Sequence, residues 1–220
     1  MKNPAFPVLT GTVLALLLAA QPAQAVDVLF NTNPFVGSVA DPDDGARTVF
    51  AGNQINLATF DAATDRFVFD RSFFDVGNSL SFANSLAVNL PGSGINVVVI
   101  EDNTTTTGAA FNAGTAANLI AQAVTSDGAG FFYYNNSGLQ VNRLVYSTNL
   151  NSPTADLSVL ARINSPAGLD AVAALPGFTA ANFALAPVPE PETYTLLLAG
   201  LALVAVGARA SRGAPRGTWA

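Results

Sequence analysis

The chain has 220 residues and contains no Cys and no His, which excludes disulfides, thiol nucleophiles, imidazole bases and zinc or copper sites built on those side chains. Charged residues make up 11% of the chain and hydrophobic residues 50%, so it is expected to fold. The net charge is −6, and residues 26–187 hold five Arg, no Lys and thirteen acidic residues, a net charge of −8. Such a domain repels nucleic acid, and its expected partners are sugars, cations or other proteins.

Residues 1–25 have the pattern of a secretory signal peptide. Lys2 gives a positive start, residues 13–20 form a short apolar core, and Ala23 and Ala25 supply the small side chains that precede a cleavage site. We expect signal peptidase to cut after Ala25. An ordinary membrane helix is the alternative, but the apolar run is too short for one.

Strands are predicted in the body by alternation of polar and apolar residues and by β-branched or aromatic runs. In chain order they cover residues 66–70, 95–100, 131–134, 143–146 and 157–163. The Asn, Ser and Gly residues of 135–138 predict a turn that joins two of these strands into a hairpin.

Helices are predicted where apolar residues recur at helical spacing or where capping residues open such a run. They cover residues 79–90, 114–124 and 165–175. The first ends at Pro91-Gly92, and Thr115 is the expected N-cap of the second. Ser165 as N-cap and Pro166 at the first helical position open the third.

This mixture of elements predicts an α+β domain over residues 26–186, with a mixed or antiparallel sheet and a few short helices. A domain of this size can bury a substantial core. A wholly β sandwich is the competing interpretation. The signal helix precedes this domain, and a transmembrane helix is expected to follow it.

Two groups of oxygen-bearing side chains are candidate calcium sites, because hard cations bind several oxygens at once. The first group is Asp41, Asp43 and Asp44, which precede a Gly at position 45. The Gly comes one place too early for an EF-hand loop, so a solvated turn is the alternative interpretation. The second group is Glu101, Asp102 and Asn103, for which a calcium site and a solvated turn are again the two interpretations. No other cofactor is expected.

No catalytic residue is predicted. The acidic side chains, Asp65 and Asp70 among them, are expected to be solvated, because acids are rarely buried. The aromatic residues 131–134 offer rings on which sugars could stack. A strand places two of the four on each face, and one of those faces is expected to belong to the core.

Residues 187–220 have the pattern of a membrane-associated tail. Residues 193–208 carry no charge and would form a helix of about 24 Å, slightly short of the hydrocarbon core. The three basic residues behind it are expected to stay in the cytoplasm, which leaves the body outside. These residues are Arg209, Arg212 and Arg216. The segment in front of the helix contains Val188, Pro189, Glu190 and Pro191.

This tail resembles the PEP-CTERM sorting signal of Gram-negative bacteria in its Pro-Glu-Pro triplet, its apolar helix and its Arg-rich end. The resemblance implies that exosortase, a membrane transpeptidase, cuts near the triplet and releases or transfers the protein. It also implies transient anchoring in the inner membrane and a final location at the cell surface or outside the cell. A permanent anchor, with the triplet as a rigid spacer, is the alternative.

The body also resembles an uncharacterised domain associated with PEP-CTERM proteins, which brings no known activity. The matching stretches are residues 131–148, 154–162 and 178–183. Two functions therefore remain open. The chain is expected to be a non-enzymatic surface or extracellular matrix protein associated with exopolysaccharide and biofilm. The alternative is a calcium-assisted carbohydrate-binding module, and an enzyme is a more distant third.

Overall fold

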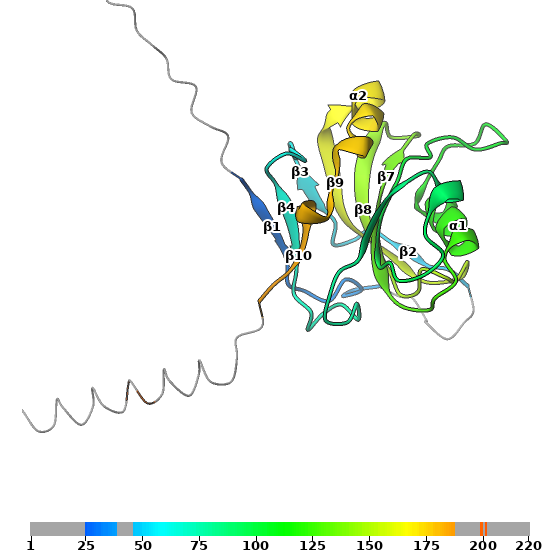
Figure 1. Ribbon diagram of the computed structural model, residues 1–220. Helices are drawn as coiled ribbons and strands as arrows, with labels where there is room; N and C mark the ends of the chain where they lie inside the picture. The colour runs from blue at the N-terminus through cyan, green and yellow to red at the C-terminus, as the bar shows by residue number, and fades with distance from the viewer. Residues whose placement is uncertain (1–24, 39–45, 188–198, 200, 202–220) are drawn as a thin grey trace, which may run out of the picture.

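The computed structural model describes residues 25–38, 46–187, 199 and 201. Figure 1 shows three layers in the body: a small sheet, a large sheet and the helix α1 (Ala113–Ala123). The second helix, α2 (Gly168–Ala173), lies at one end of the large sheet. Mixed sheet and short helices together confirm the α+β class. The predicted signal and transmembrane helices lie outside the described residues.

The small sheet has three parallel strands in the order β1-β4-β10. Its strands are β1 (Asp27–Phe30), β4 (Arg66–Phe69) and β10 (Phe183–Leu185). The predicted strand over 66–70 is thereby confirmed as β4, which pairs with both others. The first and the last strand of the body therefore flank the same central strand, although they are more than 150 residues apart in the chain.

The large sheet has seven strands in the order β2-β9-β8-β7-β6-β5, with β3 also paired to β9. Its strands are β2 (Val49–Phe50), β3 (Ile55–Leu57), β5 (Phe82–Ser85), β6 (Val97–Ile100), β7 (Gly130–Asn136), β8 (Val141–Ser147) and β9 (Leu157–Ala167). Only β8 runs antiparallel to its neighbours, so the sheet is mixed. The strands predicted over 95–100, 131–134, 143–146 and 157–163 are confirmed.

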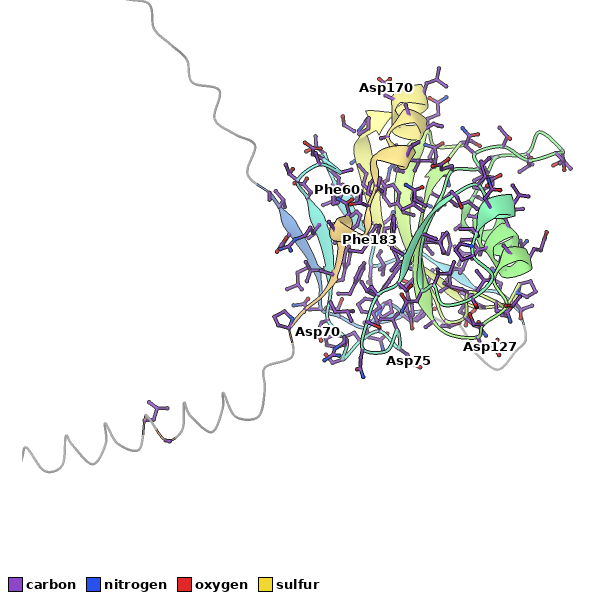
Figure 2. All side chains as sticks on the ribbon, viewed as in Figure 1. Phe60, Asp70, Asp75, Asp127, Asp170 and Phe183 are labelled. Carbon is purple, nitrogen blue, oxygen red and sulfur yellow. The ribbon has the colours of Figure 1, made fainter. Side chains whose placement is uncertain are left out.

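Aromatic rings fill the space between the two sheets. Phe67 stacks on Phe60 with ring centroids 4.1 Å apart, and Phe69 stacks on Phe131 at 3.7 Å. Phe183 joins this cluster from β10, and Figure 2 shows Phe60 and Phe183 between the sheets. A second core lies on the other face of the large sheet, where α1 contributes its buried residues.

The predicted helix over 79–90 is wrong. The segment forms β5 and then the 3₁₀ turn η1 (Ala87–Asn89). Strand β5 pairs in parallel with β6, and the Asn84 amide donates to the carbonyls of Leu175 and Phe178 at 2.9 and 3.0 Å. Ser and Asn are weak helix formers, so these sheet and side-chain bonds override the helical spacing of the apolar residues.

Two other boundaries differ from expectation. The helix α1 is capped by Asn112, whose side-chain oxygen accepts a hydrogen bond from the Thr115 amide at 3.1 Å, so the cap is Asn112 and not Thr115. The helix expected from Ser165 begins only at α2, because β9 continues through Ala167, which pairs with Val141 of β8. Ser165 and Pro166 therefore belong to a strand.

The hairpin turn also lies further along the chain than predicted. Residues 135 and 136 are the end of β7, and the turn covers residues 137–140. Both Asn side chains are buried and bonded: Asn135 donates to Asn142 at 3.0 Å, and Asn136 accepts from the Leu139 amide at 3.0 Å. The Asn142 amide in turn donates to the Ala171 carbonyl at 2.8 Å, which ties α2 to the sheet.

The small sheet and the ends of the folded domain

The folded body ends at the carboxyl edge of the small sheet. The last backbone hydrogen bond there joins the Ala186 amide to the Phe69 carbonyl at 2.8 Å. The loop that follows β4 lies at the same edge, and Figure 2 shows Asp70 close to where the chain leaves β10, with Asp75 farther along the lower side of the body. A hollow of about 580 Å³ opens in this loop, lined by Arg71, Ser72, Phe74, Asp75, Gly77 and Asn78. The tail therefore leaves the domain beside a polar surface.

One buried side chain, Asn182, fixes the start of the last strand. Its amide donates to the carbonyls of Ala62 and Asp65 at 2.7 and 2.8 Å. Its oxygen accepts from the Thr179 amide at 2.8 Å, which closes a capping box on the 3₁₀ turn η3 (Ala180–Asn182). This network binds β10 to the loop before β4, so the final strand is held by side-chain bonds as well as by its ladder.

The folded body begins at Val26, at the opposite edge of the same sheet. The Val26 carbonyl accepts from the Arg66 amide at 2.9 Å, and the Val26 amide donates to the Asp65 carboxylate at 3.1 Å. The exposed Asp27 and Arg66 form a two-point ion pair at 2.9 and 2.8 Å. The hydrogen bond from Arg66 lowers the pKa of Asp27. Val26, the residue that follows the predicted cleavage point, is therefore bonded to Asp65 and to Arg66 of β4; Ala23 lies outside the described residues.

The expectation that the acids are solvated is wrong for two of them. Asp65 is 8% exposed and Asp156 is 7% exposed. Asp65 accepts hydrogen bonds from the Asp61 amide at 2.9 Å and from the Thr64 hydroxyl at 3.0 Å, in addition to Val26. Asp156 accepts from the Thr48 amide at 2.7 Å. Hydrogen-bond donors replace the lost water, and two of them, the amides of Val26 and Thr48, come from distant segments that the sequence pattern does not reveal.

The aromatic residues 131–134 are all in the core. Their side chains are at most 1% exposed, with Phe131 and Tyr133 facing the small sheet and Phe132 and Tyr134 facing α1. Burial raises the pKa of both Tyr133 and Tyr134. The prediction of two rings on each face is confirmed, but both faces are core because the strand lies between two layers. None of these rings is open to a sugar.

The structure describes only one of the two candidate calcium sites, the group at residues 101–103. Asp41, Asp43 and Asp44 lie outside the described residues. Within the part of the chain that the structure describes, no group of three His, Cys, Asp or Glu side chains is placed to hold a metal ion. The Asp102 carboxylate has a structural role, because it accepts a hydrogen bond from the Ala87 amide at 2.7 Å, at the start of η1.

Replacing Asp102 with Ala is expected to lower the free energy of unfolding by about 1 kcal/mol, because the turn loses its capping acceptor. The loss should be the same with calcium or with a chelator, as measured by thermal unfolding. Glu101→Ala is the matched control, since no hydrogen bond to the Glu101 carboxylate is seen among the described residues. If calcium raised the melting temperature of the wild type but not of Asp102→Ala, Asp102 would be a ligand.

The sorting residues Val188, Pro189, Glu190, Pro191, Arg209 and Arg212 lie outside the described residues. None of the helices in the described part of the chain combines the length and the apolar character needed to span a bilayer. The predicted transmembrane helix over 193–208 is thus not tested by the fold.

Comparison with known families gives one match. Residues 187–212 match the PEP-CTERM protein-sorting motif. No curated protein and no solved structure matches the chain. The matched segment begins one residue after Ala186, whose amide makes the last backbone hydrogen bond of the small sheet.

Proposed function

We propose that this chain, which carries a PEP-CTERM sorting signal, is a non-enzymatic component of the extracellular polysaccharide matrix. The signal indicates an exported protein that is sorted by exosortase and is located at the cell surface or outside the cell. The finer assignment is a structural or adhesive role in exopolysaccharide and biofilm. Before processing, the helix over residues 193–208 anchors the protein in the inner membrane.

The observation that carries this proposal is the junction between fold and signal. Among the described residues, the last backbone hydrogen bond of the small sheet is made by Ala186, and the sorting motif begins at residue 187. The last strand of the small sheet in the described part of the chain ends at Leu185, two residues before the motif begins. Cutting near Pro189-Glu190-Pro191 would therefore leave the core intact, as a cleavable sorting signal requires.

Composition supports a role without catalysis. The chain lacks His and Cys, so no side chain of that kind is available to activate Ser or Thr as a nucleophile. The two most buried acids, Asp65 and Asp156, accept hydrogen bonds from backbone amides and serve the fold. Surface display of a stable domain needs only a core that persists without disulfides, and the aromatic layer between the sheets supplies it.

Replacing Pro189, Glu190 and Pro191 together with Ala is expected to leave the protein uncut and membrane-bound in a host that has exosortase. Wild type should be recovered from the surface or the medium without its tail. Both forms are followed by cell fractionation and immunoblotting. Glu192→Ala is the matched control, because it removes a neighbouring acid and keeps the triplet. Release of the triple-Ala protein at the wild-type level would show that the segment is not the sorting signal.

A further inference from the structure

Two arginines lie side by side on the large sheet. Arg143 of β8 and Arg162 of β9 are direct partners in the antiparallel register, and their row continues to Tyr134 on one side and Asn56 on the other. Side chains of direct partners start about 5 Å apart. Both arginines point to the face that carries α1, because their neighbours Leu144 and Ala161 face the small sheet.

Neither guanidinium has an anionic partner among the described residues. Among the described residues, Arg143 donates a hydrogen bond to the Gln54 side chain at 3.1 Å and also interacts with the hydroxyl of Tyr134, its partner on β7, whereas Arg162 donates none there. The Nε atoms of both are buried and have no acceptor. Within the described ranges the one ion pair is that of Asp27 and Arg66. A buried donor without an acceptor destabilises a fold, and so do like charges placed opposite each other.

This arrangement is unusual in a domain that is rich in acids. Residues 26–187 contain thirteen acidic side chains and only five arginines, yet two of the five are placed together without a carboxylate partner from the described residues. An incoming anion that contacts the exposed parts of these two side chains would relieve the repulsion between them, although the buried Nε atoms are out of its reach. The planar fork of Arg matches a carboxylate, to which it donates two parallel hydrogen bonds.

We propose that Arg143 and Arg162 bind the carboxylate of an acidic sugar of the extracellular polysaccharide. The assignment to a sugar rests on the proposed function, which places the domain in that matrix. Gln54 is half-buried and Asn56 is exposed beside the pair, and such amides bind sugar hydroxyls. An acidic peptide is disfavoured, because β8 and β9 are paired on both sides and offer no free edge to an added strand.

The net charge of −8 on residues 26–187 helps to separate binding at the arginine pair from general electrostatic attraction. An acidic domain repels polyanions in general, so binding of an acidic sugar must come from a local cationic site. Arg162→Gln removes one charge and keeps a donor of similar length. Arg71→Gln is the matched control, because Arg71 is also half-buried and belongs to the loop after β4, and within the described residues its side chain bonds only to that of Asn78, at 2.9 Å.

The test is calorimetric titration of the full chain, purified in detergent, with trigalacturonic acid at low salt. We expect binding by the wild type and by Arg71→Gln, and binding about tenfold weaker or worse in Arg162→Gln, as the loss of a charged hydrogen bond implies. The corresponding neutral trisaccharide should not bind at this site. Without ligand, Arg162→Gln should melt at the same temperature as the wild type or higher, because the repulsion is gone.

Three results would overturn the proposal. The first is no binding of trigalacturonic acid to wild type, or equal binding to Arg162→Gln. The second is tighter binding of a triaspartate peptide than of the sugar, which would assign the pair to a protein partner. The third is a lower melting temperature of Arg162→Gln with unchanged binding, which would make the pair structural. None of these results alters release of the tail, so failure of this site and failure of the sorting proposal are distinguishable.

Discussion

Phe67→Ala is expected to lower the free energy of unfolding by about 3–5 kcal/mol, and the melting temperature by roughly 10 °C. Phe67 is fully buried at the centre of β4. Its ring contacts those of Phe60, Tyr133 and Phe183, with centroids 4.1, 6.0 and 5.7 Å apart. Truncation therefore opens a cavity where both sheets and the last strand meet.

Thermal unfolding followed by circular dichroism measures this loss. Phe73→Ala is the control, because Phe73 is 39% exposed in the loop after β4 and should change stability by less than about 0.5 kcal/mol. Equal effects of the two substitutions would contradict the aromatic layer as the main core. A domain without disulfides depends on this layer, so the difference between the two variants is expected to be large.

Asp65→Asn is expected to destabilise the mature protein by about 1.5–3 kcal/mol. If signal peptidase cuts after Ala25, the nitrogen of Val26 becomes an α-ammonium group, and in the structure this nitrogen lies 3.1 Å from the Asp65 carboxylate. The hydrogen bond then becomes an ion pair at a carboxylate that is only 8% exposed. Removal of the signal peptide would in this way strengthen the attachment of β1.

A double-mutant cycle measures this coupling. Four proteins are compared: chains that begin at Val26 and chains that retain Ala25, each with either Asp or Asn at position 65. The thermal stability of each is measured. Retaining Ala25 should lower stability when Asp65 is present and have little effect in Asp65→Asn. Asp61→Asn is the control, since Asp61 is exposed and its carboxylate accepts from the Ala63 amide and not from Val26. No coupling between the cut and Asp65 would show that the amino end is held by backbone bonds alone.

Strands were predictable where side-chain pattern and pairing agree. The run at 95–100 is β-branched because β6 is buried on both faces, and burial of a parallel strand requires such a run. The segment at 79–90 misleads because its apolar spacing is helical, while its backbone bonds go to β6. Local pattern does not reveal which distant strand supplies a partner, so this error arises from tertiary pairing.

The sorting motif was predictable from its residues, but the way in which the domain's ends attach to the small sheet was not. The small side chains of Ala23 and Ala25, and the Pro-Glu-Pro triplet, lie in the chain as readable motifs. Asp65 and Asn182 hold both ends through donors and acceptors from other segments, at sequence separations of 39 and 117 or more residues. Arg143 and Arg162 likewise become neighbours only through the pairing of β8 with β9. Such contacts have no signature in a single sequence.

The shared position of both ends on one sheet links folding to processing. Strands β1 and β10 both pair with β4, so Val26, which follows the predicted signal peptide, and Ala186, which precedes the sorting motif, are both hydrogen-bonded to that strand. The two cuts that the sequence predicts would each fall just outside this sheet. The mature chain would then keep every strand of the body and lose only the segments that direct export.

Intact-mass measurement of the protein recovered from the surface or the medium of its native host tests this account most directly. The account predicts a chain that begins at Val26 and ends within residues 188–191. A recovered chain that still carries the apolar segment 193–208 and the three basic residues after it, in a host with exosortase, would contradict it and make the tail a permanent anchor.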